Sequence, residues 1–436
     1  MKELKKRILS AALIAIVACI LAISAYMMPF DRNSSTDAQS EDSLSIEIWT
    51  FFDMNTPDDY YVDYWQELAD KYGYTITVKT YSTQQIKDKL KIAAAGRQLP
   101  DIYLVWGGTY PNYLFDADLA TPVQSYLSDS DVEFLDEYTK PYSDGSNYII
   151  PCLPEAYGVT YSNTALLDKL NLTAPTTWEE LIQFVKDVNS YNEKHGTNYA
   201  AIELGNKDAW LGELLYYTIA NSLDPSAYES LVSGDISIDD SVFSTAASYI
   251  QQLEDLGAFN DNFMEIGETE AVADFIDGNA LLFPHQSTIV YYLMNNMGEE
   301  NLSVSSFPAC SDNAHGHILD INHTLKPGLC ISSTCDYPDE AASLCLEFAQ
   351  HINECNVSQY GYFNMTKQDY ELPDSLPDPV ASMRELVYGA DKISAYLYAV
   401  LPSDDANSLR SLTRNLYAGS YDTETFLDKA AIYTNP

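Results

Sequence analysis

Positive charge is scarce in this sequence. The 436 residues include 23 Lys and Arg against 64 Asp and Glu, which gives a formal net charge of −41. A chain with this balance repels nucleic-acid phosphates and anionic lipid head groups. We therefore expect no nucleic-acid partner for the folded part, and we interpret most of the acids as a solvated surface.

The sequence also lacks the short motifs that mark many catalytic and metal sites. It contains no G-x-S-x-G, no phosphate-binding G-x-x-x-x-G-K-[ST] loop and no H-E-x-x-H motif. The segment "AHGHILDINH" gathers metal-ligating residue types (His315, His317, Asp320 and His323), but no helical spacing supports a metal site, so a loop is favoured. We expect no metal and no cofactor, and no recognisable acid pair for glycoside hydrolysis is present.

Cysteine is sparse, with seven residues in the chain. Neither a dense disulfide framework nor a C-x-x-C pattern appears. Cys345 occupies an apolar position of an amphipathic stretch, which favours buried thiols, and Cys330 with Cys335 is the pair to test for a disulfide. The remaining cysteines outside the N-terminal segment are Cys152, Cys310 and Cys355.

One long hydrophobic run stands at the N-terminus, from Ile8 to Phe30, after four basic residues (Lys2, Lys5, Lys6 and Arg7). This pattern predicts a signal or membrane-anchor segment over residues 1–30 and export of the rest of the chain. Three fates stay open: lipidation of Cys19 in a lipobox-like "IVAC", cleavage near Ala22–Ser24, or an uncleaved anchor. Residues 31–43 are polar and predict a flexible linker to the outer face of the cytoplasmic membrane.

The first part of the exported chain alternates between strand and helix patterns. Period-two alternation predicts strands at 44–52, 74–81 and 101–108. The segments between them carry apolar residues at helical spacing and end at Gly73 and Gly96. Strand–helix–strand–helix–strand is the beginning of a doubly wound α/β fold. At 436 residues, the chain is also long enough for two lobes.

Helical patterns dominate the rest of the chain. Thr177 is predicted to cap a helix with Glu180 as its capping-box partner, and further helices are expected at 209–222, 241–256, 269–277 and after Pro338. Short strands are predicted at 279–284 and 328–334, and the C-terminal third is predicted to be helical. We expect Tyr161, Trp178 and the pairs Tyr216–Tyr217 and Tyr291–Tyr292 to lie in the core.

An ordered set of segments resembles a known family. The sequence is similar to the extracellular solute-binding proteins of bacterial ABC importers, in the sugar-binding family that includes maltose-binding protein. The most specific parts are Pro100-Asp101 and "TYSN…APTTWEEL". The matching segments are "SIEIWTFFD", "LKIAAAGRQLPDIYLVW", "YIIPCLPEAYGVTYSNTALLDKLNLTAPTTWEELIQFVKDV", "AVADFIDGNALLF", "GLCISSTCDYPDEAASLCLEFAQ" and "ETFLDKA".

The resemblance implies an α/β, two-lobed periplasmic-binding-protein-like fold of type II, with hinge crossovers and a ligand cleft between the lobes. It places 44–153 plus about 303–355 in the first lobe and 154–302 plus about 356–436 in the second. It implies a monomer that captures a mono- or oligosaccharide and delivers it to the ABC transporter permease by hinge closure, without enzymatic activity. In this scheme "YIIPCLPEAYGVTYSN" is the first crossing between lobes.

Proteins recognise sugars with flat aromatic faces and paired polar groups. Because the chain has many aromatic residues, we choose candidate ligand contacts by their place in the predicted fold. Trp106 ends a central strand at Gly107-Gly108, where parallel strands open toward a crevice, and the family places an aromatic there. Trp49 is out of phase with the apolar residues of its strand, which makes it a further candidate. Trp210 stands where the family often places an aromatic over the ligand.

Polar candidates come from three segments. Glu155 aligns with a carboxylate that contacts sugar in the maltose-binding branch, so we expect Glu155→Gln to weaken binding and to leave thermal stability nearly unchanged. Where many relatives carry a tryptophan segment, this chain has Pro284-His285-Gln286-Ser287, which leaves His285 and Gln286 as candidates and puts maltodextrin specificity in doubt. Near the C-terminus, "SAYLYAV" offers Tyr398 and its neighbour Tyr396.

Two other functions stay open at this point. The chain could be an exported glycan-degrading enzyme, which turnover of an oligosaccharide would reveal. It could also use the same fold to bind a metal ion, a peptide or a polyamine, since a strongly acidic surface is compatible with a cationic ligand.

Overall fold

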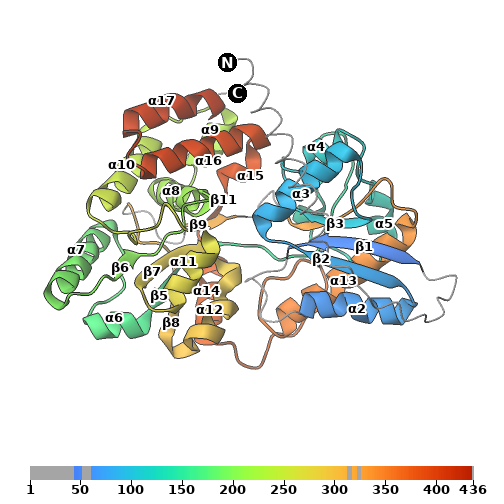
Figure 1. Ribbon diagram of the computed structural model, residues 1–436, viewed down its shortest axis with the longest axis horizontal. Helices are drawn as coiled ribbons and strands as arrows, with labels where there is room; N and C mark the ends of the chain where they lie inside the picture. The colour runs from blue at the N-terminus through green and yellow to red at the C-terminus, as the bar shows by residue number, and fades with distance from the viewer. Residues whose placement is uncertain (1–43, 52–59, 312–316, 322–325, 435–436) are drawn as a thin grey trace, which may run out of the picture. The chain divides into compact units, whose positions relative to one another are not determined.

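The computed structural model describes residues 44–51, 60–311, 317–321 and 326–434. From Leu44 on, these residues form one compact unit that contains 5-stranded, 4-stranded and 2-stranded sheets with helices packed around them (Figure 1). The two larger sheets have separate hydrophobic cores. This is the predicted two-lobed α/β architecture, and we call the part around the 5-stranded sheet the first lobe and the rest the second lobe.

The first lobe is built on a sheet with the order β2-β1-β3-β10-β4. Its parallel part confirms the strand–helix–strand–helix–strand prediction, since β1 pairs in parallel with both β2 and β3. β10 pairs antiparallel with β3 and β4. The elements are β1 (Ser45–Thr50), α2 (Tyr60–Tyr72), β2 (Thr75–Thr80), α3 (Thr83–Gly96), β3 (Ile102–Val105), α4 (Asn112–Phe115), α5 (Gln124–Asp129), η1 (Asp136–Thr139), β4 (Ile150–Pro151), β10 (Gly328–Ile331) and α13 (Pro338–Ser358).

Helix α3 matters for the site, and its ends are well defined. The Ser82 side chain accepts a hydrogen bond from the Gln85 backbone N–H, and the Gln85 side chain accepts one from the Ser82 N–H, which forms a capping box. The helix ends at Gly96, but the left-handed residue is Arg97, with φ 50°. Ile86 and Leu90 are fully buried, so they fix the orientation of this helix against the sheet.

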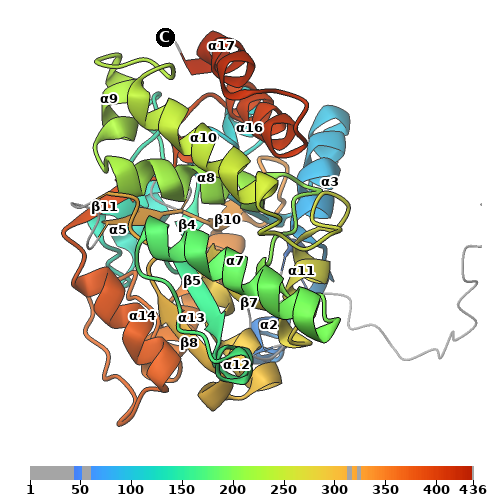
Figure 2. The same ribbon diagram turned by 90° about the vertical axis from the view of Figure 1, so that its left-hand side faces the viewer.

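The second lobe contains a sheet with the order β6-β7-β5-β8. Helix α8 contacts β7 on one side and α10 and α16 on the other (Figure 2). The elements up to β9 are β5 (Gly158–Asn163), α6 (Thr164–Leu170), α7 (Trp178–His195), β6 (Ala200–Ile202), α8 (Trp210–Leu223), α9 (Ala227–Ser233), α10 (Ser241–Asp255), α11 (Glu268–Ile276), β7 (Ala280–Gln286), η2 (Ser287–Ile289), α12 (Val290–Met297), η3 (Glu299–Asn301), β8 (Leu302–Ser305) and β9 (His317–Asp320).

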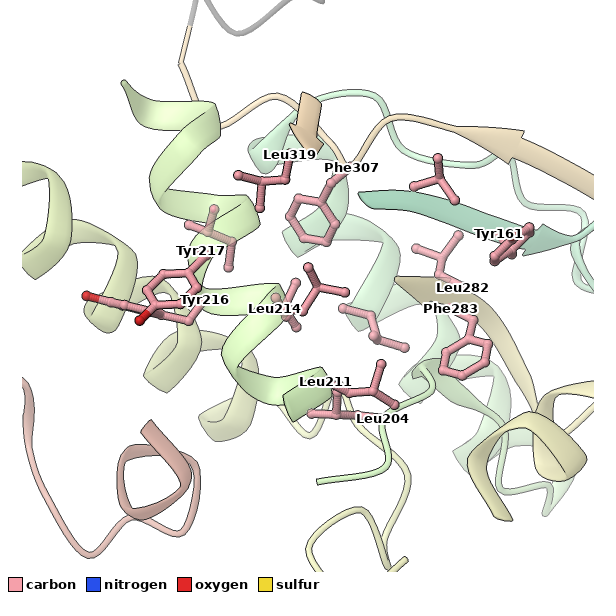
Figure 3. Packing of buried hydrophobic residues seen from close by; sticks show 14 of the residues in the cluster. Tyr161, Leu204, Leu211, Leu214, Tyr216, Tyr217, Leu282, Phe283, Phe307 and Leu319 are labelled. Carbon is pink, nitrogen blue, oxygen red and sulfur yellow. The ribbon is translucent and has the colours of Figure 1, made fainter. Parts of the chain in front are cut away.

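The core of the second lobe joins this sheet to α8. Figure 3 shows Tyr161, Leu282 and Phe283 from the strands facing Leu211 and Leu214 from the helix. The predicted core residues Tyr161, Trp178, Tyr216 and Tyr217 are all buried, and Tyr291 and Tyr292 pack against the same core. Thr177 caps α7 as predicted, and the Glu180 carboxylate accepts a hydrogen bond from the backbone N–H of Thr176 at 2.8 Å.

After α13, the described residues form helices and one strand. β11 pairs in parallel with β9, so "KISA" is extended where a helix was predicted. This pairing brings Tyr396 and Tyr398 to the start of the short helix α15. The elements are α14 (Asp378–Tyr388), β11 (Lys392–Ala395), α15 (Leu397–Val400), α16 (Ser403–Tyr417) and α17 (Thr423–Thr434).

Neighbouring segments carry the chain between the lobes. The first crossing runs from β4 to β5, and a return crossing runs from β9 to β10. They are hydrogen-bonded to each other, since Ile321 N–H donates to Ala156 O at 2.8 Å and Cys152 N–H donates to Pro327 O at 3.3 Å. The predicted return at about residue 303 differs from this arrangement, because β8 pairs with β5 in the second lobe.

Candidate functional site

A cavity of about 270 Å³ is lined by residues of both lobes. The first lobe contributes the region after β1, the start of α3 and the residues that follow β3, while the second lobe contributes the N-terminal parts of α8 and α11, the end of β7 and residues of α15 and α16. The first crossing also reaches the cavity through Leu153, Pro154 and Ala156. Ligand cavities commonly lie at such an interface between substructures.

Aromatic rings form much of the cavity wall. In the first lobe, Phe51 stacks on Trp106 with ring centroids 4.5 Å apart, and Tyr110 meets Trp106 edge-on at 5.9 Å. The second lobe supplies further aromatic side chains. The aromatic residues that line the cavity are Phe51, Tyr61, Trp106, Tyr110, Trp210, Tyr362, Tyr396 and Tyr398.

A buried ion pair supports the second-lobe wall. Arg410 Nε–H donates to Glu213 Oε2 at 2.7 Å, and the Tyr396 hydroxyl donates to the same oxygen at 2.7 Å. The guanidinium lies 3.7 Å from the centre of the Tyr398 ring, a cation–π contact. Burial raises the pKa of Glu213, and the Arg410 charge opposes this shift. Arg410, Tyr396 and Tyr398 therefore form one connected wall held by a single carboxylate.

Lys87 is the charged group that the first lobe places in the cavity. Its Nζ lies 4.5 Å from the centre of the Trp106 ring and 5.5 Å from that of Tyr110. Burial lowers its pKa to about 7, and the positive charge of Arg410 acts in the same direction.

Acidic residues line another part of the cavity, near the N-terminus of α11. The Glu270 carboxylate accepts a hydrogen bond from the Gly267 backbone N–H at 3.2 Å, which caps the helix. Glu268 Oε1 lies 3.3 Å from Nε2 of the buried His285. Asp208 is exposed to solvent.

The sequence of this chain matches the family model for bacterial extracellular solute-binding proteins over residues 58–343, more than half of its length. The chain belongs to that family. A comparison with curated protein sequences gave no significant match.

Solved structures share the fold of this solute-binding protein. A structure from work on xylan utilization by the thermophilic bacterium Caldanaerobius polysaccharolyticus is 23% identical, with a TM-score of 0.77 over 89% of this chain and 99% of that chain. A chitin oligosaccharide binding protein is 18% identical, with a TM-score of 0.77 over 90% and 98%. A Bacillus licheniformis sugar transporter protein in complex with stachyose is 15% identical, with a TM-score of 0.66 over 90% and 99%. These matches agree with the predicted two-lobed fold.

Four of the residues predicted from the sequence line the cavity. Trp106, Trp210, Gln286 and Tyr398 come from separate segments and meet there. They stay predicted ligand contacts. Tyr396, which the sequence offered together with Tyr398, also lines the cavity.

Trp49 and His285 do not line the cavity, and each has protein partners instead. The Trp49 Nε1–H donates to Glu47 Oε1 at 2.5 Å, and its ring meets that of Tyr81 edge-on. His285 is fully buried and contacts the Trp210 ring edge-on, with centroids 5.2 Å apart. His285 therefore supports Trp210 and Glu268, which do line the cavity.

Glu155 also lies outside the cavity lining, although its neighbours Pro154 and Ala156 belong to it. It is buried and forms an ion pair with Lys326, which precedes β10. Asp320, at the end of β9, lies 3.8 Å from the same ammonium group. Glu155, which the sequence predicted as a ligand contact, thus connects the first crossing between the lobes to the return crossing.

This contact changes the expected effect of Glu155→Gln. Loss of the buried charge partner should lower the free energy of unfolding by about 2 kcal/mol, because Lys326 then keeps only weaker interactions, with Asp320 and with the charge of Glu137 beyond ion-pair distance. Denaturant unfolding of the variant measures this change, with Glu133→Gln as the control because the Glu133 side chain is exposed. An unchanged midpoint for Glu155→Gln would mean that the ion pair has no net stabilising effect.

The sequence did not single out Lys87, Arg410, Glu213 or Tyr110. Lys87 is one of several lysines on an amphipathic helix, and Arg410 lies more than three hundred residues further along the chain. Only Tyr110 carried a local signal, since it closely follows Trp106 at the carboxyl end of β3.

The described residues hold no group of at least three His, Cys, Asp or Glu side chains arranged for a metal ion. His315 and His323, from the histidine-rich segment, lie outside them. The six cysteines in the described part are free thiols, and all but Cys335 are buried. Cys19 and the predicted signal or anchor segment also lie outside the described residues, and none of the described helices has the length and hydrophobicity needed to cross a bilayer.

Proposed function

We propose that this solute-binding protein captures a carbohydrate between its lobes and delivers it to the permease of an ABC importer. The observation that carries the proposal is the cavity wall, where aromatic rings from both lobes stand beside polar groups. Aromatic faces pack on the C–H faces of a pyranose ring, while carboxylates, amides and hydroxyls bond its hydroxyl groups. Similar folds that bind stachyose and chitin oligosaccharide support the assignment.

Capture works by closure of the lobes around the ligand. Contacts from both sides favour the closed arrangement, because they are complete only when the lobes approach each other. The paired crossings between β4 and β5 and between β9 and β10 form the hinge in this proposal. We place the first lobe at 44–153 plus about 326–358, and the second at 154–321 together with the C-terminal helices.

The proposal includes export and attachment at the outer face of the cytoplasmic membrane through residues 1–30. Mass spectrometry of the protein from its native membrane distinguishes the possible forms. A diacylated Cys19, an intact Met1 and a cleaved N-terminus near Ser24 give different masses.

Binding without turnover is the decisive test of the function. The purified full-length protein in detergent should bind one or more oligosaccharides saturably in calorimetry, and chromatography should recover them unchanged. Release of shorter sugars would instead indicate a glycan-degrading enzyme. Binding of a metal ion, a peptide or a polyamine, with no sugar bound, would also overturn the proposal.

Trp210→Ala should weaken binding of the sugar found in that screen by at least about tenfold, because the variant removes an aromatic face of the cavity wall. Calorimetric titration measures the change. Tyr388→Ala is the matched control, since Tyr388 is 67% exposed on α14 and lies outside the cavity lining. Equal sugar affinity for the Trp210→Ala and Tyr388→Ala variants would show that Trp210 does not contribute to sugar binding.

A further inference from the structure

Lys87 is a partly buried lysine without a carboxylate partner among the described residues. The chain has few basic residues and many acids, yet among the described residues no carboxylate lies within ion-pair distance of the Lys87 ammonium group, while it lies against the rings of Trp106 and Tyr110. Lys89 and Lys91 on the same helix also lack an ion pair with a described carboxylate, but they are exposed and water solvates their charge, whereas Lys87 is partly buried. Lys87 therefore brings to the cavity wall an amine whose charged form has no carboxylate partner among the described residues.

The acids that line the same cavity do not neutralise Lys87. Glu270 is used in the cap of α11, and Glu268 lies beside His285. Asp208 is exposed to solvent, where water screens its charge. Glu213 and Glu268 affect Lys87 only from beyond ion-pair distance.

Arg410 adds a second positive charge from the opposite lobe. Its guanidinium is bonded to Glu213, but the cation still disfavours the charged form of Lys87, as does Lys91 on the same helix as Lys87. Partial burial makes a charged amine costly, and an anionic ligand group would offset that cost. The field of a strongly acidic protein repels anionic ligands in general, so a local cation is needed for one to enter.

We propose that the cavity accepts a sugar that carries an anionic group, a carboxylate such as that of a hexuronate, and that Lys87 binds this group. The proposal rests on the carbohydrate function proposed above and names the class of sugar. The Lys87 ammonium group would donate a charge-assisted hydrogen bond to the carboxylate. The pyranose ring would pack against the neighbouring rings of Trp106 and Tyr110.

Matched pairs of sugars test the proposal on the full-length protein. Each pair differs only at C6, a hydroxymethyl group in one sugar and a carboxylate in the other, for example galacto- and galacturono-oligosaccharides of equal length. Calorimetry should give at least about tenfold tighter binding of the carboxylated member, the ratio expected for one charge-assisted hydrogen bond. A sulfated sugar of the same length shows whether the site prefers a carboxylate or accepts any anion, and a sulfate preference would overturn the carboxylate assignment.

Variants of α3 assign the effect to Lys87. Lys87→Gln should bind both members of a pair equally, and Lys87→Arg should keep the preference. Lys89→Gln is the control, because it removes the same charge from an exposed position of the same helix. Thermal unfolding of each variant shows whether it is folded, and Lys87→Arg tests the role of the charge even if Lys87→Gln does not fold.

The outcomes separate this inference from the function on which it rests. Tight binding of neutral sugars with no gain from a carboxylate overturns the inference and leaves the carbohydrate function intact. If Lys87→Gln still prefers the carboxylated sugar, another group binds the carboxylate, and the inference about Lys87 is also overturned. Binding of no sugar, neutral or charged, overturns the carbohydrate function itself.

Discussion

Replacing Glu203 with glutamine should stabilise this protein at pH 8 by about 2–4 kcal/mol, a large effect for a single substitution. Glu203 follows β6 and is fully buried between Ile202 and Leu204, which are also buried. Neither of its carboxylate oxygens has a hydrogen-bond partner among the described residues. Burial raises the pKa of this carboxyl group to about 9, and Asp274 adds to the shift.

The pH dependence follows from this shift. The unfolded chain loses the Glu203 proton near pH 4.5, whereas the folded protein keeps it until about pH 9. The stabilising contribution of the bound proton is therefore complete below about pH 4.5 and is lost progressively as the pH rises through the interval to about 9. Glutamine has the shape of the protonated acid and does not ionise, so it avoids this loss.

Denaturant unfolding at several pH values between about 5 and 9 measures the effect. The free energy of unfolding of the wild type should fall across this range relative to that of Glu203→Gln. Asp274→Asn should make the fall smaller, because Asp274 contributes to the raised pKa of Glu203. Glu193→Gln provides the control, because Glu193 is exposed on α7. Parallel stability curves for wild type and Glu203→Gln would contradict the prediction and would mean that water or another group solvates the carboxylate.

Local patterns predicted the regular elements of this fold well. Alternating Ile46 and Ile48 define the buried face of β1, and the Thr177 cap defines the start of α7. The strand at β11 was missed because "KISA" is extended through its pairing with β9, a contact that no local pattern encodes. The return crossing was misplaced for the same reason, since only the pairing of β8 with β5 assigns it to the second lobe.

The candidate site was harder to predict from the sequence, because its charged groups depend on contacts between distant segments. Trp106 could be found from its place after a central strand. Glu155 was given a cleft-facing role, but its partner Lys326 lies on the other crossing. Lys87 and Arg410 have no sequence signal that brings them together, and only the folded arrangement of α3 and α16 places both on one cavity.

Glu213→Gln should lower the free energy of unfolding by about 3–5 kcal/mol, the cost of leaving a buried charge without its partner. Glu213 is fully buried, and the Arg410 side chain is only 15% exposed. Arg410→Met should also destabilise, but by less, because the pKa of Glu213 is already raised by burial and the acid can take up a proton. Chemical unfolding of both variants measures the two costs.

The double variant Glu213→Gln/Arg410→Met separates stability from binding. Its free energy of unfolding should lie well above the value that additive costs predict, because neither charge is then left alone and the introduced amide can still accept the Tyr396 hydrogen bond. Ligand affinity should not recover, since Tyr398 loses the guanidinium that packs on its ring and the cavity loses a lining cation. Strictly additive costs would show that the two side chains are not coupled. Recovery of affinity together with stability would show that the ion pair supports the fold and that Arg410 has no part in recognising the ligand.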